Sequence, residues 1–238
     1  MRSRSTVTAW PHPFVFDRLD AIEATVCQDS RMILSAELRW IWEGAVPERL
    51  RRWFAGSGCP PGGGKPREDV YLLEPDQVEL GLKQRARKGG VEIKGLVRRA
   101  EQPLAAGPFA GHIEVWSKWT SEALRLDGLP SLVVRKERRL RKLDTGTAHV
   151  HEIALGPEET PLQGGLPEEG CNLELTEVSV AERPGTWGTL GFEAFGSLER
   201  VEINLERAIG HVLGTGVPEF PRGVEQSYPV WIRARKVG

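Results

Sequence analysis

The stretch Met32–Glu43, MILSAELRWIWE, alternates side chains of two kinds, as a β-strand with two different faces does. Ile33, Ser35, Glu37 and Arg39 share one face, which is mostly polar. The opposite face carries only apolar side chains: Leu34, Ala36, Leu38, Trp40 and Trp42. This stretch therefore predicts a strand that separates a charged environment from a hydrophobic one.

Further strands with similar alternation follow along the chain. Val78–Arg87 and Val91–Val97 predict a hairpin, because Lys88-Gly89-Gly90 between them is a good turn sequence. The other predicted strands are Asp69–Leu73, Gly111–Thr120, Leu132–Leu143, Ala148–Leu155, Asn172–Ala181 and Leu190–Phe195. Lys, Arg and Glu recur on one face of most of these strands. The segment Gly56–Pro66 predicts a loop.

Two amphipathic helices are predicted beside these strands. Pro47–Phe54 has Pro at its first turn. Leu198–Leu213 is followed by Gly214, a residue type that commonly ends a helix. Roughly eight short strands with so few helices cannot bury a flat sheet, so we expect the sheet to close on itself. The expected fold is α+β and mainly antiparallel β: a roughly eight-stranded, closed or nearly closed tunnel barrel with flanking helices. An open sheet with a solvated polar face is the alternative.

Length and composition fit a globular protein, with 238 residues, 39% hydrophobic and 27% charged. We expect one domain over residues 31–238, with residues 1–30 as a peripheral segment. No apolar stretch approaches the roughly 20 residues that span a bilayer, and the N-terminus lacks a signal-peptide pattern. The cysteines Cys27, Cys59 and Cys171 are widely spaced, so a reduced, cytoplasmic protein is expected.

Charge is unevenly distributed although the net charge is only −1. Lys83–Lys142 is rich in Lys and Arg, whereas Asp144–Gly210 is rich in Asp and Glu. The two regions could simply form two solvated faces. They could also bring cations and carboxylates to one site, the combination that phosphate chemistry with a metal requires.

Short motifs in a particular order carry a resemblance to a known family. They are Ser35-Ala36-Glu37-Leu38-Arg39, Lys83-Gln84-Arg85, Glu92-Ile93-Lys94, Lys136-Glu137-Arg138, Asn172-Leu173-Glu174-Leu175-Thr176-Glu177, Gly191-Phe192-Glu193-Ala194-Phe195-Gly196 and Ser227-Tyr228-Pro229-Val230-Trp231-Ile232. In this order they resemble the CYTH superfamily, also called triphosphate tunnel metalloenzymes. The resemblance runs from about Met32 to Ile232.

This resemblance implies a polar-lined barrel that binds a small triphosphate or polyphosphate compound with Mg²⁺ or Mn²⁺. The family's opening strand reads Glu-x-Glu-x-Lys, whereas this chain has Ser35, Glu37 and Arg39 at those places. The implied metal ligands are Glu37, Glu174 and Glu193, of which Glu37 and Glu174 are also the catalytic candidates. The implied phosphate-binding residues are Arg39, Lys83, Arg85, Lys94, Lys118, Lys136 and Arg138.

Three functions remain open from the sequence. The first is a metal-dependent hydrolase of phosphoric anhydrides. The second is a non-catalytic phosphate- or nucleotide-binding module, because Ser35 removes one metal-binding carboxylate. The third and least favoured is a single-stranded nucleic-acid binder that stacks bases on Trp116 and Trp119. Interior carboxylates such as Glu92 and Glu114 could instead pair with the cations. Gly62-Gly63-Gly64-Lys65 is not a phosphate-binding P-loop, because Pro66 follows the lysine.

Overall fold

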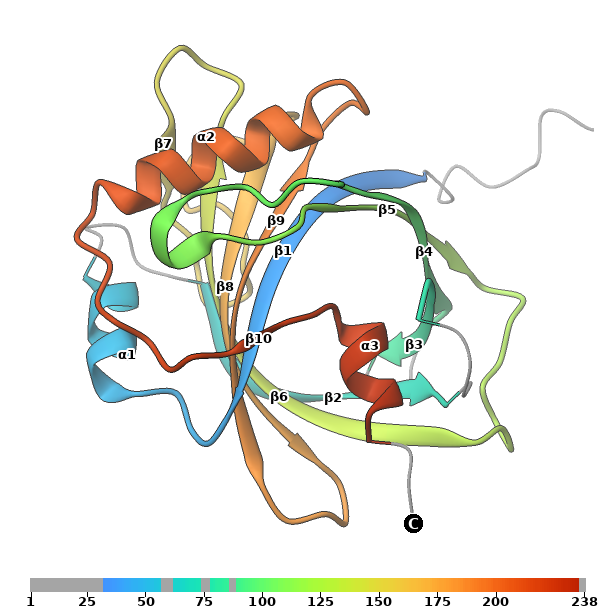
Figure 1. The fold of residues 1–238 in the computed structure, drawn as a ribbon. Helices are drawn as coiled ribbons and strands as arrows, with labels where there is room; N and C mark the ends of the chain where they lie inside the picture. The colour runs from blue at the N-terminus through green and yellow to red at the C-terminus, as the bar shows by residue number, and fades with distance from the viewer. Residues whose placement is uncertain (1–31, 57–61, 74–77, 86–88, 236–238) are drawn as a thin grey trace, which may run out of the picture. The chain divides into compact units, whose positions relative to one another are not determined.

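The computed structural model describes residues 32–56, 62–73, 78–85 and 89–235, and the statements below concern these residues (Figure 1). The chain divides into two units, and every described residue belongs to the second, Met32–Gly238. The expected peripheral segment, Cys27, Cys59 and the turn residue Lys88 lie outside the described residues.

The strands form one antiparallel sheet that closes into a barrel. Their bounds are β1 Ile33–Glu43, β2 Gly62–Leu72, β3 Leu80–Arg85, β4 Val91–Arg99, β5 Glu114–Ser121, β6 Ser131–Asp144, β7 His151–Ile153, β8 Gly170–Val180, β9 Thr186–Phe195 and β10 Val224–Glu225. The barrel order is β1-β5-β4-β3-β2-β6-β8-β9, and pairing of β9 with β1 closes it. The short strands β7 and β10 add to β6 and β1. The prediction of a mainly antiparallel, eight-stranded barrel is confirmed.

The main hydrophobic core lies outside the barrel wall. The apolar face of β1, including Leu38 and Trp40, packs with apolar residues of β8 and β9 against α2 (Val201–Leu213). Leu50 and Phe54 of α1 (Glu48–Ala55) and Phe109 of the 3₁₀ turn Gly107–Phe109 join the same core. In Figure 1, α2 lies across the outer side of β8, β9 and β1. The polar face of β1 consequently faces the barrel interior.

A second apolar cluster lies inside one end of the barrel. The helix α3 (Tyr228–Arg233) places Trp231 and Ile232 against Ile41, Tyr71 and apolar residues of β6 and β8. Figure 1 shows α3 within the ring of strands. The C-terminal motif that carried part of the resemblance therefore forms part of the barrel interior.

The predicted loop Gly56–Pro66 was wrong for its described second part, because β2 begins at Gly62. Gly63 and Gly64 have φ of +88° and +95°, and the pairing register with β6 shifts between Gly63 and Pro66. Glycine makes such a bulge possible, since larger residues rarely adopt positive φ. The Gly-rich composition thus marked an irregular strand, not a connection.

Most other predicted boundaries differ from the structure by a few residues. The helix expected from Leu198 begins at Val201, and the strand expected over Ala148–Leu155 shortens to His151–Ile153. No helix among the described residues is long and apolar enough to cross a membrane.

Candidate anion-binding site

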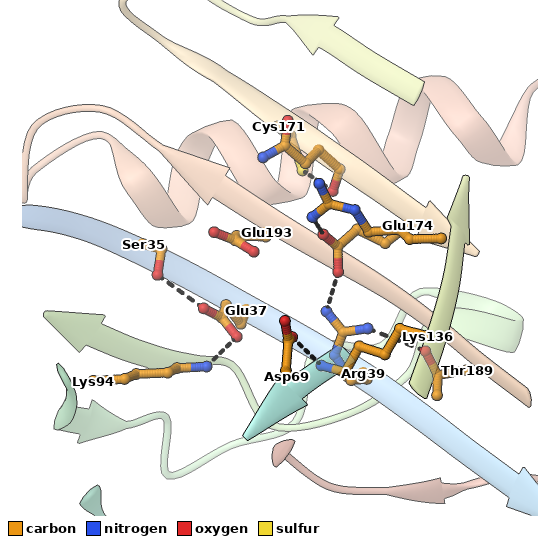
Figure 2. Close-up of polar contacts among 12 residues, drawn as sticks. Ser35, Glu37, Arg39, Asp69, Lys94, Lys136, Cys171, Glu174, Thr189 and Glu193 are labelled. Atoms are coloured by element: carbon orange, nitrogen blue, oxygen red, sulfur yellow. Dashed lines mark hydrogen bonds and ion pairs between the residues drawn. The ribbon is translucent and has the colours of Figure 1, made fainter. Parts of the chain in front are cut away.

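Glu37 on β1 is the centre of a buried ion-pair cluster (Figure 2). Its two carboxylate oxygens lie 2.5 Å from Lys94 Nζ and 2.8 Å from Lys118 Nζ. Lys118 Nζ also lies 2.5 Å from Glu193 Oε1, and Ser35 Oγ donates a hydrogen bond to Glu37 Oε1 at 2.9 Å. Strands β1, β4, β5 and β9 therefore bring predicted cations and predicted carboxylates to one place in the interior.

Arg39 lies two residues further along β1 and belongs to a second cluster (Figure 2). Its Nη2 lies 2.6 Å from Glu174 Oε2, and its Nη1 donates to Thr189 Oγ1 at 3.2 Å. Arg138 Nη1 lies 2.6 Å from the other oxygen, Glu174 Oε1. One carboxylate on β8 thus holds two guanidinium groups, from β1 and from β6.

Lys136 on β6 is only 4% exposed and has a weaker charge partner. Its Nζ lies 3.3 Å from Asp69 Oδ2 and donates a hydrogen bond to the hydroxyl of Tyr71. The same Nζ lies 3.7 Å from the ring centroid of Tyr228 on α3, a cation–π distance. Neither oxygen of the fully buried Asp69 has a hydrogen-bond partner among the described residues. Asp69 therefore interacts with Lys136 and with Arg67 Nε, 3.6 Å from its Oδ1, as an ion-pair partner without hydrogen-bond geometry.

Lys83 and Arg85 on β3 share one carboxylate, that of Glu92 on β4. Lys83 Nζ lies 2.7 Å from Glu92 Oε1, and Arg85 Nη2 lies 3.6 Å from Glu92 Oε2. The side chain of Arg85 is 54% exposed. Lys83 therefore has a close charge partner, whereas Arg85 lies in a largely solvated position.

A small cleft adjoins the clusters where β5 separates from β1. The last residue pair between these strands is Glu37–Glu114, and Glu225 of β10 pairs with Trp40, three residues further along β1. The cleft at this separation is lined by Glu37, Arg39, Arg99, His112, Glu114, Glu225, Ser227 and neighbouring residues. Half of the Arg99 side chain is exposed here, so the cleft connects solvent-accessible groups with interior ones.

The buried carboxylates remain ionised because cations surround them. Burial by itself raises the pKa of Glu37, but Lys118 and Lys94 outweigh burial and hold that pKa well below its ordinary value. Burial likewise raises the pKa of Glu174, and Arg138 and Arg39 lower it far more. Both groups are therefore stable as anions in the interior.

Two of the interior lysines are less well compensated. Burial lowers the pKa of Lys94 more than Glu37 raises it, and burial lowers the pKa of Lys136 well below its ordinary value despite Asp69. Lys118 behaves differently, because Glu193 and Glu37 outweigh burial and raise its pKa. An additional anion near Lys94 or Lys136 would stabilise their charged forms.

The expected metal ligands do not form a metal site in this arrangement. Within residues 32–235, outside the segments left undescribed, no group of three or more His, Cys, Asp or Glu side chains could hold a metal ion. The ammonium of Lys118 lies between Glu37 and Glu193, and Glu174 binds two arginines. Mg²⁺ needs a near-octahedral shell of oxygen ligands. The residues as placed do not fit one.

Several residues of the site were not predicted. Asp69 and Tyr71 alternate within the predicted strand Asp69–Leu73, so their shared interior face could have been read from the sequence. Glu159, which pairs with Arg138, and Tyr228 lie outside the strands. No periodic pattern could have placed these two side chains in the site.

No family model matches the chain, and no curated protein matches it significantly. The resemblance to the CYTH superfamily therefore stays a prediction.

Proposed function

We propose that the barrel binds a small phosphate-rich anion, a triphosphate or polyphosphate compound, through its interior Lys and Arg side chains. The observation that carries the proposal is the convergence of basic side chains from separate strands on one interior. Arg39, Lys94, Lys118, Lys136 and Arg138 come from β1, β4, β5 and β6, and each is largely buried. Such groups bind phosphate oxygens by charge-assisted hydrogen bonds.

Stability alone does not require so many charges in a barrel interior. Removing charges from water is costly, and buried ion pairs often contribute no more than apolar residues of similar volume. The other end of this barrel is filled by apolar residues around Trp231 of α3. The charged side chains around Glu37 and Arg39 therefore support a role in ligand recognition.

The incomplete pairing of Lys94 and Lys136 supports an anionic ligand in particular. A phosphate group near these lysines would supply the negative charge that the surrounding carboxylates do not supply in full. Anion binding should therefore be accompanied by proton uptake at alkaline pH, where part of the lysine population is neutral.

Titration calorimetry with sodium tripolyphosphate tests the proposal. We expect the wild-type chain to bind without added metal, and Lys94→Gln to bind at least about tenfold more weakly, which corresponds to 1.4 kcal/mol. Arg135→Gln is the matched control, because Arg135 lies on the outer face of β6 with a 65% exposed side chain paired to Glu68. Equal affinities in wild type, Lys94→Gln and Arg135→Gln would refute the assigned site.

Metal-dependent hydrolysis of the same anion is the alternative that the family resemblance favours. It requires carboxylates to leave their present cation partners before they can bind Mg²⁺ or Mn²⁺. The same protein should be assayed for phosphate release with and without each ion. Metal-dependent turnover that Glu174→Gln abolishes would replace the binding-only proposal.

Nucleic-acid binding has less support from the side chains. Trp116 is fully buried, and Lys94 Nζ lies 4.3 Å from the centroid of its ring. The ring is therefore not available to stack on a base. Absence of binding to single-stranded RNA and DNA at low salt is the expected result.

A further inference from the structure

Glu159 reaches the interior from a loop and not from a strand of the barrel. Arg138 Nε donates a hydrogen bond to Glu159 Oε1 at 3.0 Å, and Arg138 Nη2 forms an ion pair with Glu159 Oε2. Glu159 lies in the connection between β7 and β8, beyond the end of β7 at Ile153. Arg138 therefore has two carboxylate partners, one on β8 and one on this connection.

Glycine residues of β2 leave room for this contact. A Cβ atom on Gly63 would lie 2.5 Å from the Arg138 carbonyl oxygen and 2.8 Å from Glu159 Oε1. A Cβ atom on Gly62 would lie 3.0 Å from Glu159 Cα. Side chains at these positions would press on Glu159 and on the β6 backbone, so the two glycines allow the loop to lie this close to β2.

The two carboxylates that pair with Arg138 differ in how easily they can move away from it. Glu174 lies in the middle of β8, its side chain is 6% exposed, and it also holds Arg39. The Glu159 side chain is 24% exposed, and its backbone φ of +62° is unfavourable for a non-glycine residue. Glu159 is thus the partner whose departure breaks fewer contacts and relieves backbone strain.

Charge balance makes such a departure necessary for anion binding at this place. Arg39, Arg138, Glu174 and Glu159 form a cluster of two cations and two anions. A phosphate group gains little from a neutral cluster but is attracted to one with a net positive charge. Loss of Glu159 from the cluster would give Arg138 free donors for phosphate oxygens.

We propose that Glu159 is a displaceable internal counter-ion, which occupies a phosphate position on Arg138 until an anion replaces it. The inference rests on the proposed anion-binding function and identifies what sets the affinity of that site. Backbone hydrogen bonds within the loop, Gly156 N to Thr160 O at 2.8 Å and Leu162 N to Ala154 O at 2.9 Å, hold residues 154–162 together. Because these bonds hold the loop where Glu159 reaches Arg138, displacement of Glu159 should loosen them.

Titration calorimetry with tripolyphosphate on Glu159→Gln and Glu158→Gln tests the inference. Glu158 is the matched control, because it is adjacent, carries the same charge and pairs on the surface with the exposed Lys65. Glu159→Gln should bind about tenfold or more tightly than wild type, and Glu158→Gln should bind like wild type. Glu159→Gly is a second variant, which removes the carboxylate at a positive φ that glycine tolerates.

The outcomes separate this inference from the proposed function. If wild type binds tripolyphosphate but neither Glu159 variant binds more tightly than Glu158→Gln, the counter-ion role is refuted and anion binding stands. If no form of the protein binds, the proposed function fails and the counter-ion role fails with it. Hydrogen exchange adds a direct readout, since residues 156–162 of wild type should exchange faster when tripolyphosphate is bound. Unchanged exchange in a bound sample would overturn displacement of the loop.

Discussion

The guanidinium of Arg39 lies directly over Gly191, its partner residue on β9, where a Cβ atom would come within 2.7 Å of Arg39 Cζ. Gly191 also pairs in register with Glu174 on β8. The missing side chain at Gly191 is therefore what allows the arginine of β1 to lie across β9 and meet the carboxylate of β8.

Gly191→Ala should displace Arg39 and weaken its pairing with Glu174. We expect a loss of about 1–3 kcal/mol in the free energy of unfolding, as for overpacked interior sites. Affinity for tripolyphosphate should fall as well. Gly210→Ala is the control, because Gly210 lies in α2 with no heavy atom near its Cβ position, and alanine there should stabilise by up to about 1 kcal/mol. Urea unfolding of the two variants measures the difference, and equal stabilities would contradict the steric role of Gly191.

Glu174→Gln should leave two buried arginines without their shared charge partner. Breaking a buried pair in this way costs about 3–5 kcal/mol. Glu177→Gln is the control on the same strand, since Glu177 pairs with the partly exposed Arg51 on the outer face and should cost less than about 1 kcal/mol. Thermal unfolding with and without tripolyphosphate should show a larger gain in Tm for Glu174→Gln than for Glu177→Gln. A Glu174→Gln protein as stable as wild type would show that the cluster adds nothing to folding.

The ionised state of Glu37 predicts a dependence of stability on pH. Its pKa is lower in the folded chain than in the unfolded chain, so its contribution is complete above the unfolded value of about 4.3 and is lost as pH falls towards the folded value. Wild type should lose stability between about pH 5 and pH 3, and Glu37→Gln should lose less over the same range. Urea midpoints measured across this range test the prediction. Parallel pH profiles for the two proteins would rule out Glu37 as a source of the effect.

Tyr228 should stabilise the interior through its ring more than through its hydroxyl. The ring centroid lies 3.7 Å from Lys136 Nζ and 4.7 Å from Arg39 Cζ. Tyr228→Leu removes both cation–π contacts and should cost roughly 2 kcal/mol or more, whereas Tyr228→Phe keeps them and should cost about 1 kcal/mol. Urea unfolding compares the two variants. A larger loss for Tyr228→Phe than for Tyr228→Leu would show that the hydroxyl dominates.

Alternation along the strands was enough to determine which side chains share a face. In Met32–Glu43 the polar residues Glu37 and Arg39 alternate with apolar ones, and the two sets lie inside and outside the barrel as predicted. Successive strand side chains point to opposite faces, so this assignment needs no knowledge of the partner strands. The number of strands and the scarcity of helices also favoured closure of the sheet.

Only the tertiary structure decided which charges meet. The pairing of Glu37 with Lys94 and Lys118 depends on the register between β1 and β5 and between β4 and β5, which joins residues far apart in the chain. The contact of Glu159 with Arg138 depends on a loop that passes a glycine-only part of β2. Alternation identifies a charged interior, but ion pairs form between side chains within a few ångströms, and that proximity follows from strand register and loop path.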